Sequence, residues 1–132
     1  MEFLTQPWFD AVQKELDANE QLALAAASVK LGIQQVVTDA PGGGEIKHHF
    51  TIDHGSIHIG LGELPADQAN ATLTANYESA AAMNRGDLDM MSAFATGKVL
   101  VTGDMMVMMQ HQAALAQLNT AFEAVRDSTT YA

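Results

Sequence analysis

The stretch from residue 46 to residue 61 constrains the fold of this chain more than any other. Apolar and polar side chains alternate over residues 46–53 and again over 56–61, and His54 and Gly55 separate the two runs. This spacing predicts a β-hairpin with a two-residue turn. The predicted pairs are Asp53 with Ser56, Ile52 with Ile57, Phe50 with Ile59 and His48 with Leu61. One face of the hairpin is then apolar and the other polar, which is typical of an antiparallel sheet with one buried face.

The rest of the chain alternates between predicted helices and predicted strands. Thr5 is expected to cap a first helix and Asn19 a second, because apolar residues recur at helical spacing after each. Strands are expected at 31–40, 71–75 and 99–102, and short helices at 77–84 and 89–96. Asp104 is expected to cap a helical tract that is either one helix or two, with a break near Gln112 or Asn119. Antiparallel strands with helices in separate segments predict an α+β fold.

Composition excludes several classes of function. The 132 residues, 48% of them hydrophobic, suit one globular domain over residues 1–132. A formal net charge of −10 repels phosphate backbones and anionic lipid surfaces, so we expect no nucleic-acid partner. The chain has no cysteine, which excludes a disulfide and a thiol nucleophile. Because no run of about 18 apolar residues and no signal peptide is present, we expect no stable membrane insertion and a cytoplasmic location.

Methionine is unusually frequent on both sides of the strand expected at 99–102. Seven of the eight methionines lie between Met83 and Met109. This flexible, polarizable side chain suits an apolar cavity that must accept ligands of varied shape, although it also fills ordinary cores. Residues 105–109 (MMVMM) are all apolar and surround a helix turn. That helix should therefore be covered on more than one side, by the sheet and by a ligand, another helix or a subunit.

Four histidines fall within residues 48–58, but their spacing does not impose a metal site. His49 and His58 are diagonal neighbours on the polar face of the predicted hairpin, with Asp53 nearby. Zinc needs ligands that converge, and no third ligand is imposed here. His48 falls on the apolar face, where we expect a backbone group to satisfy it. Since no nucleophile–base pair or phosphate loop is present either, we expect no catalytic residue, no metal and no cofactor.

Three segments of the second half occur in a characteristic order. They are residues 70–74 (NATLT), 86–89 (GDLD) and 93–104 (AFATGKVLVTGD). In this order they resemble the sterol carrier protein type-two family, the sterol-transfer domain, whose members continue with a helix rich in Leu and Met. Residues 5–8 (TQPW) also look like the opening of bacterial members that consist of this domain alone. The resemblance thus extends over the whole chain.

The resemblance implies a fold, a class of ligand and a site. The fold is a five-stranded, mainly antiparallel sheet covered on one face by helices, with an apolar cavity between them. The ligand is a fatty acid, a fatty acyl-CoA, a sterol-like lipid or a phospholipid, which is bound and carried without catalysis. By resemblance, the ligand-binding positions are Met90, Met91, Phe94, Met105, Met108 and Met109. The alternative is an accessory or dimerisation module whose apolar surface is covered by a partner chain, so a homodimer stays open.

Overall fold

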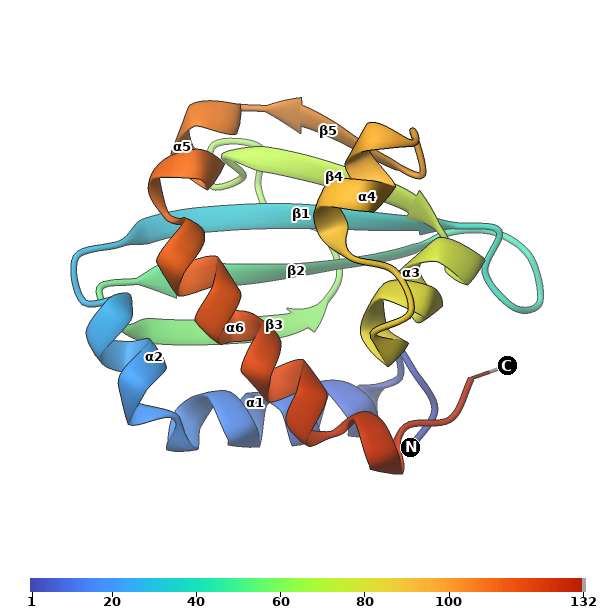
Figure 1. Ribbon diagram of the computed structural model, residues 1–132, viewed down its shortest axis with the longest axis horizontal. Coiled ribbons are helices and arrows are strands. Elements are labelled where there is room, and N and C mark those ends of the chain that lie inside the picture. Colours follow the sequence, from blue (N-terminus) through green and yellow to red (C-terminus); the bar gives the residue numbers. More distant parts are fainter. Residues whose placement is uncertain (132) are drawn as a thin grey trace.

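Five strands form one sheet that positions every helix (Figure 1). The computed structural model describes residues 1–131, with all side chains except those of Met90, Met108, Gln112, Ala113, Leu115, Ala116 and Asn119. The strands are β1 (Lys30–Thr38), β2 (Ile46–Asp53), β3 (Ser56–Leu61), β4 (Ala71–Asn76) and β5 (Val99–Gly103). They lie in the order β3-β2-β1-β4-β5, so β3 and β5 are the two edge strands.

The sheet is mixed but mainly antiparallel. Strand β1 pairs antiparallel with β2, β2 with β3 and β4 with β5, whereas β1 and β4 run parallel. The parallel pair arises because the chain leaves the hairpin at one edge and returns on the other side of β1. A five-stranded, mainly antiparallel sheet with helices on one face is therefore confirmed.

The hairpin has the predicted register. Ile52 lies opposite Ile57 and Phe50 opposite Ile59, and the remaining two pairs also agree. In the turn, His54 and Gly55 have φ angles of 48° and 93°. Positive φ at both turn residues matches the twist of the flanking strands, and glycine adopts it without steric cost.

Within residues 1–131, six α-helices lie on one side of the sheet. They are α1 (Gln6–Ala18), α2 (Glu20–Ala25), α3 (Tyr77–Arg85), α4 (Met90–Ala95), α5 (Met105–Gln110) and α6 (Gln112–Ala124). Asn19 caps α2 as predicted, since its side chain accepts a hydrogen bond from the Leu22 amide at 3.0 Å. Thr5 occupies the N-cap position of α1 as predicted, but its hydroxyl donates to the Glu2 carbonyl and makes no capping bond.

The C-terminal helical tract consists of two helices. Asp104 caps α5, its side chain accepting from the Val107 amide at 3.2 Å. The helix ends at Gln110, and His111 alone separates it from α6. The break thus lies next to Gln112, at one of the two positions left open by the sequence. None of the helices that the structure describes combines the length and the hydropathy that crossing a bilayer requires.

The core lies between the sheet and the helices, with α1 at the β3 end and α6 running diagonally across the sheet (Figure 1). Trp8 is 1% exposed and organises the aromatic part of this core. Its ring packs edge-on against Phe9 and stacks on Phe122, with ring centroids 5.0 and 5.7 Å apart. The sheet contributes Leu31, Ile33, Phe50, Ile52, Ile57, Ile59 and Leu73 to the same core.

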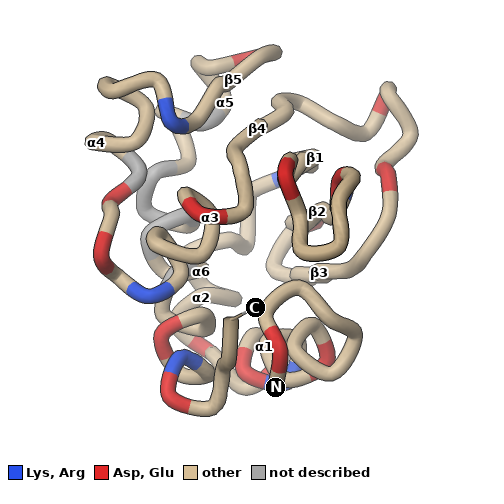
Figure 2. The backbone as a smooth tube through the Cα atoms, turned by 90° about the vertical axis from the view of Figure 1, so that its right-hand side faces the viewer, with Lys and Arg blue, Asp and Glu red and all other residues tan. Residues whose placement is uncertain are grey.

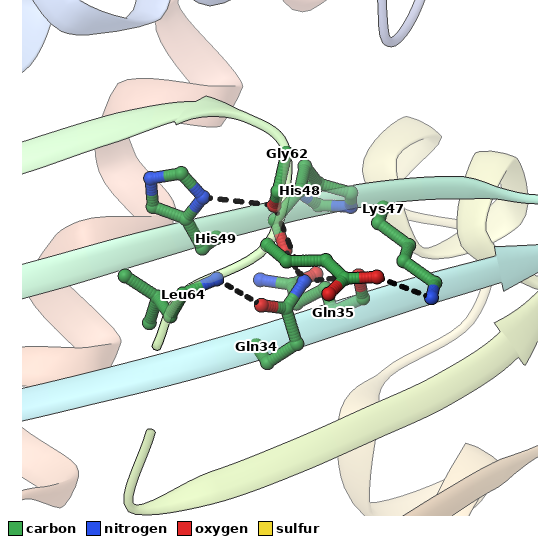
Figure 3. Close-up of polar contacts among 8 residues, drawn as sticks. Gln34, Gln35, Lys47, His48, His49, Gly62 and Leu64 are labelled. Carbon is green, nitrogen blue, oxygen red and sulfur yellow. Dashed lines mark hydrogen bonds and ion pairs between the residues drawn. The ribbon is translucent and has the colours of Figure 1, made fainter. Parts of the chain in front are cut away.

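The loop between β3 and β4 covers part of the opposite face of the sheet, over β1. A Cβ atom on Gly32 would lie 2.0 Å from the carbonyl oxygen of Gln68, so the loop approaches β1 as closely as only glycine allows. The buried Gln34 side chain holds the loop: its amide donates to the Gly62 carbonyl, and its oxygen accepts from the Leu64 amide at 2.6 Å (Figure 3). The hydrogen bonds of Gln34 thus tie this layer to the sheet.

Candidate functional site

The predicted ligand-binding residues lie on the two short helices that flank β5. We call residues 90–109 the β5 corner. Met91 and Phe94 lie on α4, and Met105 and Met109 on α5. These four side chains are 74%, 44%, 43% and 61% exposed, although all are large and apolar. The side chains of Met90 and Met108, also predicted to bind ligand, lie outside what the structure describes.

Local interactions hold α4 and α5 beside β5. Asp89 caps α4 by accepting from the Ser92 amide at 2.8 Å, and this bond lowers the pKa of Asp89. Helix α4 packs against β5, and Ala93 on α4 and Val99 on β5 are both buried. The amide of Asp104, after β5, donates to the Asn70 carbonyl at 2.8 Å. The small Ala93 and the β-branched Val99 are thus buried within the corner, whereas the larger apolar side chains of Met91, Phe94, Met105 and Met109 remain exposed.

Sequence reasoning missed one large residue of this region. Leu100 lies on β5 opposite Thr74, on the face of the sheet away from the helices, and is strongly exposed. Alternation along β5 could have revealed it, because Val99 is buried and neighbouring strand residues point to opposite faces. Apolar side chains thus extend around the β5 edge onto both faces.

Neither of two hollows among the described residues is lined by Met91, Phe94, Met105 or Met109. One, of about 360 Å³, lies between the α1–α2 connection and α6 and is lined by polar residues such as Glu15, Asn19 and Thr120. The other, of about 250 Å³, lies under the β3–β4 loop on the outer face of the sheet, beside Gln34 and Lys47 (Figure 3). The apolar cavity expected between sheet and helices stays a prediction.

His48 contradicts the expectation that a backbone group satisfies it. Its ring is buried against Phe9, with centroids 5.5 Å apart, and its Nδ1 atom has no hydrogen-bond partner among the described residues. Burial, and secondarily the nearby His49, lowers the pKa of His48 to about 4, so the ring is neutral at pH 7. The Nε1 atom of Trp8 is also buried without a described partner. The prediction failed because α1 covers this end of β2.

Two of the other hairpin histidines, the half-buried His49 and the exposed His54, bond locally, and His58 is exposed. His49 Nδ1 lies 3.0 Å from the Gly62 carbonyl, and His54 Nδ1 lies 2.7 Å from Asp53 (Figure 3 shows His49). The His54 bond lowers the pKa of Asp53. In the part of the chain that the structure describes, no three His, Asp or Glu side chains are placed to hold a metal ion together.

The sequence matches one known family over most of its length. Residues 9–116 match the model of the SCP-2 sterol transfer family. This span includes the whole sheet and all the predicted ligand-binding residues. No curated protein sequence matches the chain significantly.

Solved structures with the same fold include several sterol carrier proteins. A Thermus thermophilus protein, described as a possible sterol carrier protein, superposes with a TM-score of 0.74 at 20% identity, over 98% of this chain and 92% of that one. A crystal structure of sterol carrier protein 2 has a TM-score of 0.73 at 18% identity, over 91% and 96% of the two chains. The apo form of the Yarrowia lipolytica protein has a TM-score of 0.66 at 20% identity, over 86% and 88%. At such identities the superpositions establish the shared fold.

Proposed function

The chain belongs to the SCP-2 sterol transfer family, and we propose that it binds and carries an apolar lipid at the β5 corner without catalysing a reaction. Membership in this family supports lipid binding or transfer as the general function. The finer proposal is that the ligand is a fatty acid, a fatty acyl-CoA, a sterol-like lipid or a phospholipid, held in an internal apolar tunnel that opens at this corner. The whole chain acts as one binding domain in the cytoplasm.

One observation carries the choice of site. Met91, Phe94, Met105 and Met109 are large apolar side chains that the chain itself leaves exposed on both sides of β5. An acyl chain lying against them, together with Met90 and Met108, would remove apolar surface from water, a gain of about 25 cal/mol for each Å². Unbranched methionines can adjust to ligands of different shape. The site thus selects for an apolar chain rather than for one particular ligand.

Ligand binding can be separated from folding at this site. We expect Met109→Lys to weaken binding of a fluorescent fatty-acid analogue at least about tenfold, because the bound acyl chain would desolvate the new charge. The melting temperature of the ligand-free protein should change by less than about 2 °C, since Met109 is already exposed. A titration beside a thermal melt measures both quantities.

Leu24→Lys is the matched control. Leu24 is also apolar and exposed but lies on α2, at the far end of the sheet, so the variant should bind like the wild type. Native mass spectrometry of the purified protein adds an independent readout, a bound lipid mass. Equal binding by the wild type and Met109→Lys, or no binding by the wild type, would contradict the proposal.

A further inference from the structure

Two buried ring nitrogens lie in the apolar interior between the sheet and the helices. His48 Nδ1 and Trp8 Nε1 both lack a hydrogen-bond partner among the described residues. Both rings contact Phe9, with centroids 5.5 and 5.0 Å from the centroid of that ring. A buried polar atom without a partner costs free energy, so two of them beside one ring point to a further polar group that binds there.

A third polar side chain, that of Gln35, faces the same interior. Alternation along β1 places Gln35 with Ile33 and Val37 on the inner face of the sheet, the face toward the helices. Gln35 lies opposite His48, and its side chain makes no hydrogen bond to the described residues. It is half-buried, whereas Ile33 and Val37 are 0% and 3% exposed. The inner face is therefore less tightly covered at Gln35 than on either side of it.

The sheet register connects these groups to the β5 corner. His48 lies opposite Gln35, Gln35 opposite Leu73, and Leu73 opposite Val101. Residues that lie opposite each other point to the same face, so this row crosses the inner face from β2 to β5. Neighbouring strands are about 4.8 Å apart, which makes the row about 14 Å long. A lipid tail along the row would extend from the polar side chains to the β5 corner.

The inner face of the strands carries no charge. The charged residues of the five strands are Lys30, Lys47 and Asp53, and all of them occupy the alternate positions, on the outer face. Figure 2 shows most of the blue and red segments in the helices and connecting loops. The lowered pKa of His48 leaves its ring neutral at pH 7. A carboxylate or phosphate on this face would be buried without a counter-charge, which is costly.

We propose that Trp8, His48 and Gln35, the inner polar residues, bind the hydroxyl group of an uncharged lipid. The inference rests on the proposed function and names the chemical class of the ligand. A hydroxyl both donates and accepts: Trp8 Nε1 can donate to its oxygen, and His48 Nδ1 accepts its proton in the tautomer with hydrogen on Nε2. The Gln35 amide can do either. A fatty acid would bind in the reverse direction, with its carboxylate in water at the β5 corner.

Displacement of a bound fluorescent fatty-acid analogue tests the preference for a hydroxyl. The competitors are decanol, chlorodecane and decanoate at pH 7, which share a chain length and differ in the head group. Decanol should compete with the wild type at a concentration at least about fivefold lower than either of the others, because it alone gains the hydrogen bonds. The double variant Gln35→Leu/His48→Leu should lose this preference and still bind chlorodecane like the wild type. His58→Leu, at an exposed histidine of the same hairpin, is the matched control and should keep the preference.

The indole signal of Trp8 gives a direct readout. The chain has one tryptophan, so its Nε1–H group gives a single signal in a ¹⁵N-edited NMR spectrum. Decanol should shift this signal in a saturable manner, and chlorodecane should shift it much less. An indole signal that responds equally to the two ligands would overturn the inference.

The displacement assay separates failure of this inference from failure of the proposed function. If the three competitors are equally effective, or if the double variant keeps the preference for decanol, the inference is overturned while lipid binding stands. Ordered water would then satisfy the two ring nitrogens. If the wild type binds neither the analogue nor decanol, the proposed function fails and this inference fails with it.

Discussion

The two edge strands of the sheet lie in opposite environments. At the β3 edge, the Gln13 side chain of α1 donates to the Ile57 carbonyl at 2.8 Å and accepts from the Ile59 amide at 2.9 Å. Its amide thus pairs with β3 as a further strand would. Among the described residues, no side chain bonds to the backbone of β5 in this way. One edge is closed by the chain itself, and the other is bordered by exposed apolar residues.

The apolar side chains beside the two edge strands also differ in how deeply they are buried. Beside β3, rigid aromatic rings such as Trp8 and Phe9 are almost completely buried and pack at defined angles. Beside β5, flexible methionines remain exposed. Hydrophobicity alone therefore does not decide whether a segment becomes core, because coverage by another element is needed as well. The β3 end therefore contributes buried core, whereas the β5 corner leaves its described large apolar side chains exposed.

The largest effect should follow removal of the Trp8 ring. Trp8→Ala should lower the free energy of unfolding by about 3–5 kcal/mol, because it leaves a cavity among Phe9 and Phe122. Met106→Ala at the β5 corner should change it by less than about 0.5 kcal/mol. Urea denaturation measures both. Similar losses in the two variants would mean that the corner is packed like the β3 end.

Lowering the pH should have a smaller effect on the free energy of unfolding, through His48 at the same end of the sheet. In the unfolded chain His48 takes up a proton below pH 6.5, but in the folded chain only near pH 4. Stability is therefore fully present above pH 6.5 and falls by about 3 kcal/mol as the pH decreases to 4. His48→Leu should remove this loss of stability on acidification. Denaturation at several pH values would measure it. An unchanged pH dependence in the variant would show that folding does not lower the pKa of His48.

The hydrogen bonds that close the β3 edge should contribute less to the free energy of unfolding than Trp8 or His48. Gln13→Ala removes two hydrogen bonds to β3 and should cost about 1–2 kcal/mol of unfolding free energy. Gln6→Ala on the same helix removes only an exposed bond to Asp10 and should cost less than about 0.5 kcal/mol. Hydrogen exchange of the Ile59 amide would locate the effect. A Gln13 variant as stable as the Gln6 variant would show that the edge needs no closure.

The smallest effect on stability, but a clear one on binding, is expected at the corner. Met105→Leu/Met109→Leu should change the free energy of unfolding by less than about 0.5 kcal/mol, since both residues are exposed. Leucine is branched and less deformable, so the variant should discriminate more strongly among acyl chains of different length. Titrations with fluorescent fatty-acid analogues of several lengths would compare the profiles. Identical profiles would rule out a role for methionine flexibility.

Much of the fold could be predicted because it is encoded locally. The hairpin register follows from alternation and from the two turn residues, and the caps at Asn19 and Asp104 involve residues only three apart. The surroundings of His48 were mispredicted because they depend on α1, which is distant in sequence. The outer layer held by Gln34 escaped prediction for the same reason, since its partners at 62–64 come from another strand end.

The candidate site was only partly predictable. Methionine density and family resemblance indicated which residues flank β5, and the structure places the four described ones there. Their exposure could not be inferred, because residues 105–109 are apolar throughout and nothing local decides which side another element covers. Leu100 was missed for a related reason, since it extends the apolar surface onto the far face of the sheet.

Methyl NMR of the methionines tests the central claim most directly, that lipid binds at the β5 corner and not at the β3 end. Seven of the eight methionines lie between Met83 and Met109, and Met1 provides an internal reference at the termini. On titration with a fatty acid, the ¹³C-methyl signals of Met91, Met105 and Met109 should shift in a saturable manner, while that of Met1 stays in place. Saturable binding that leaves the three corner signals unmoved would contradict the account.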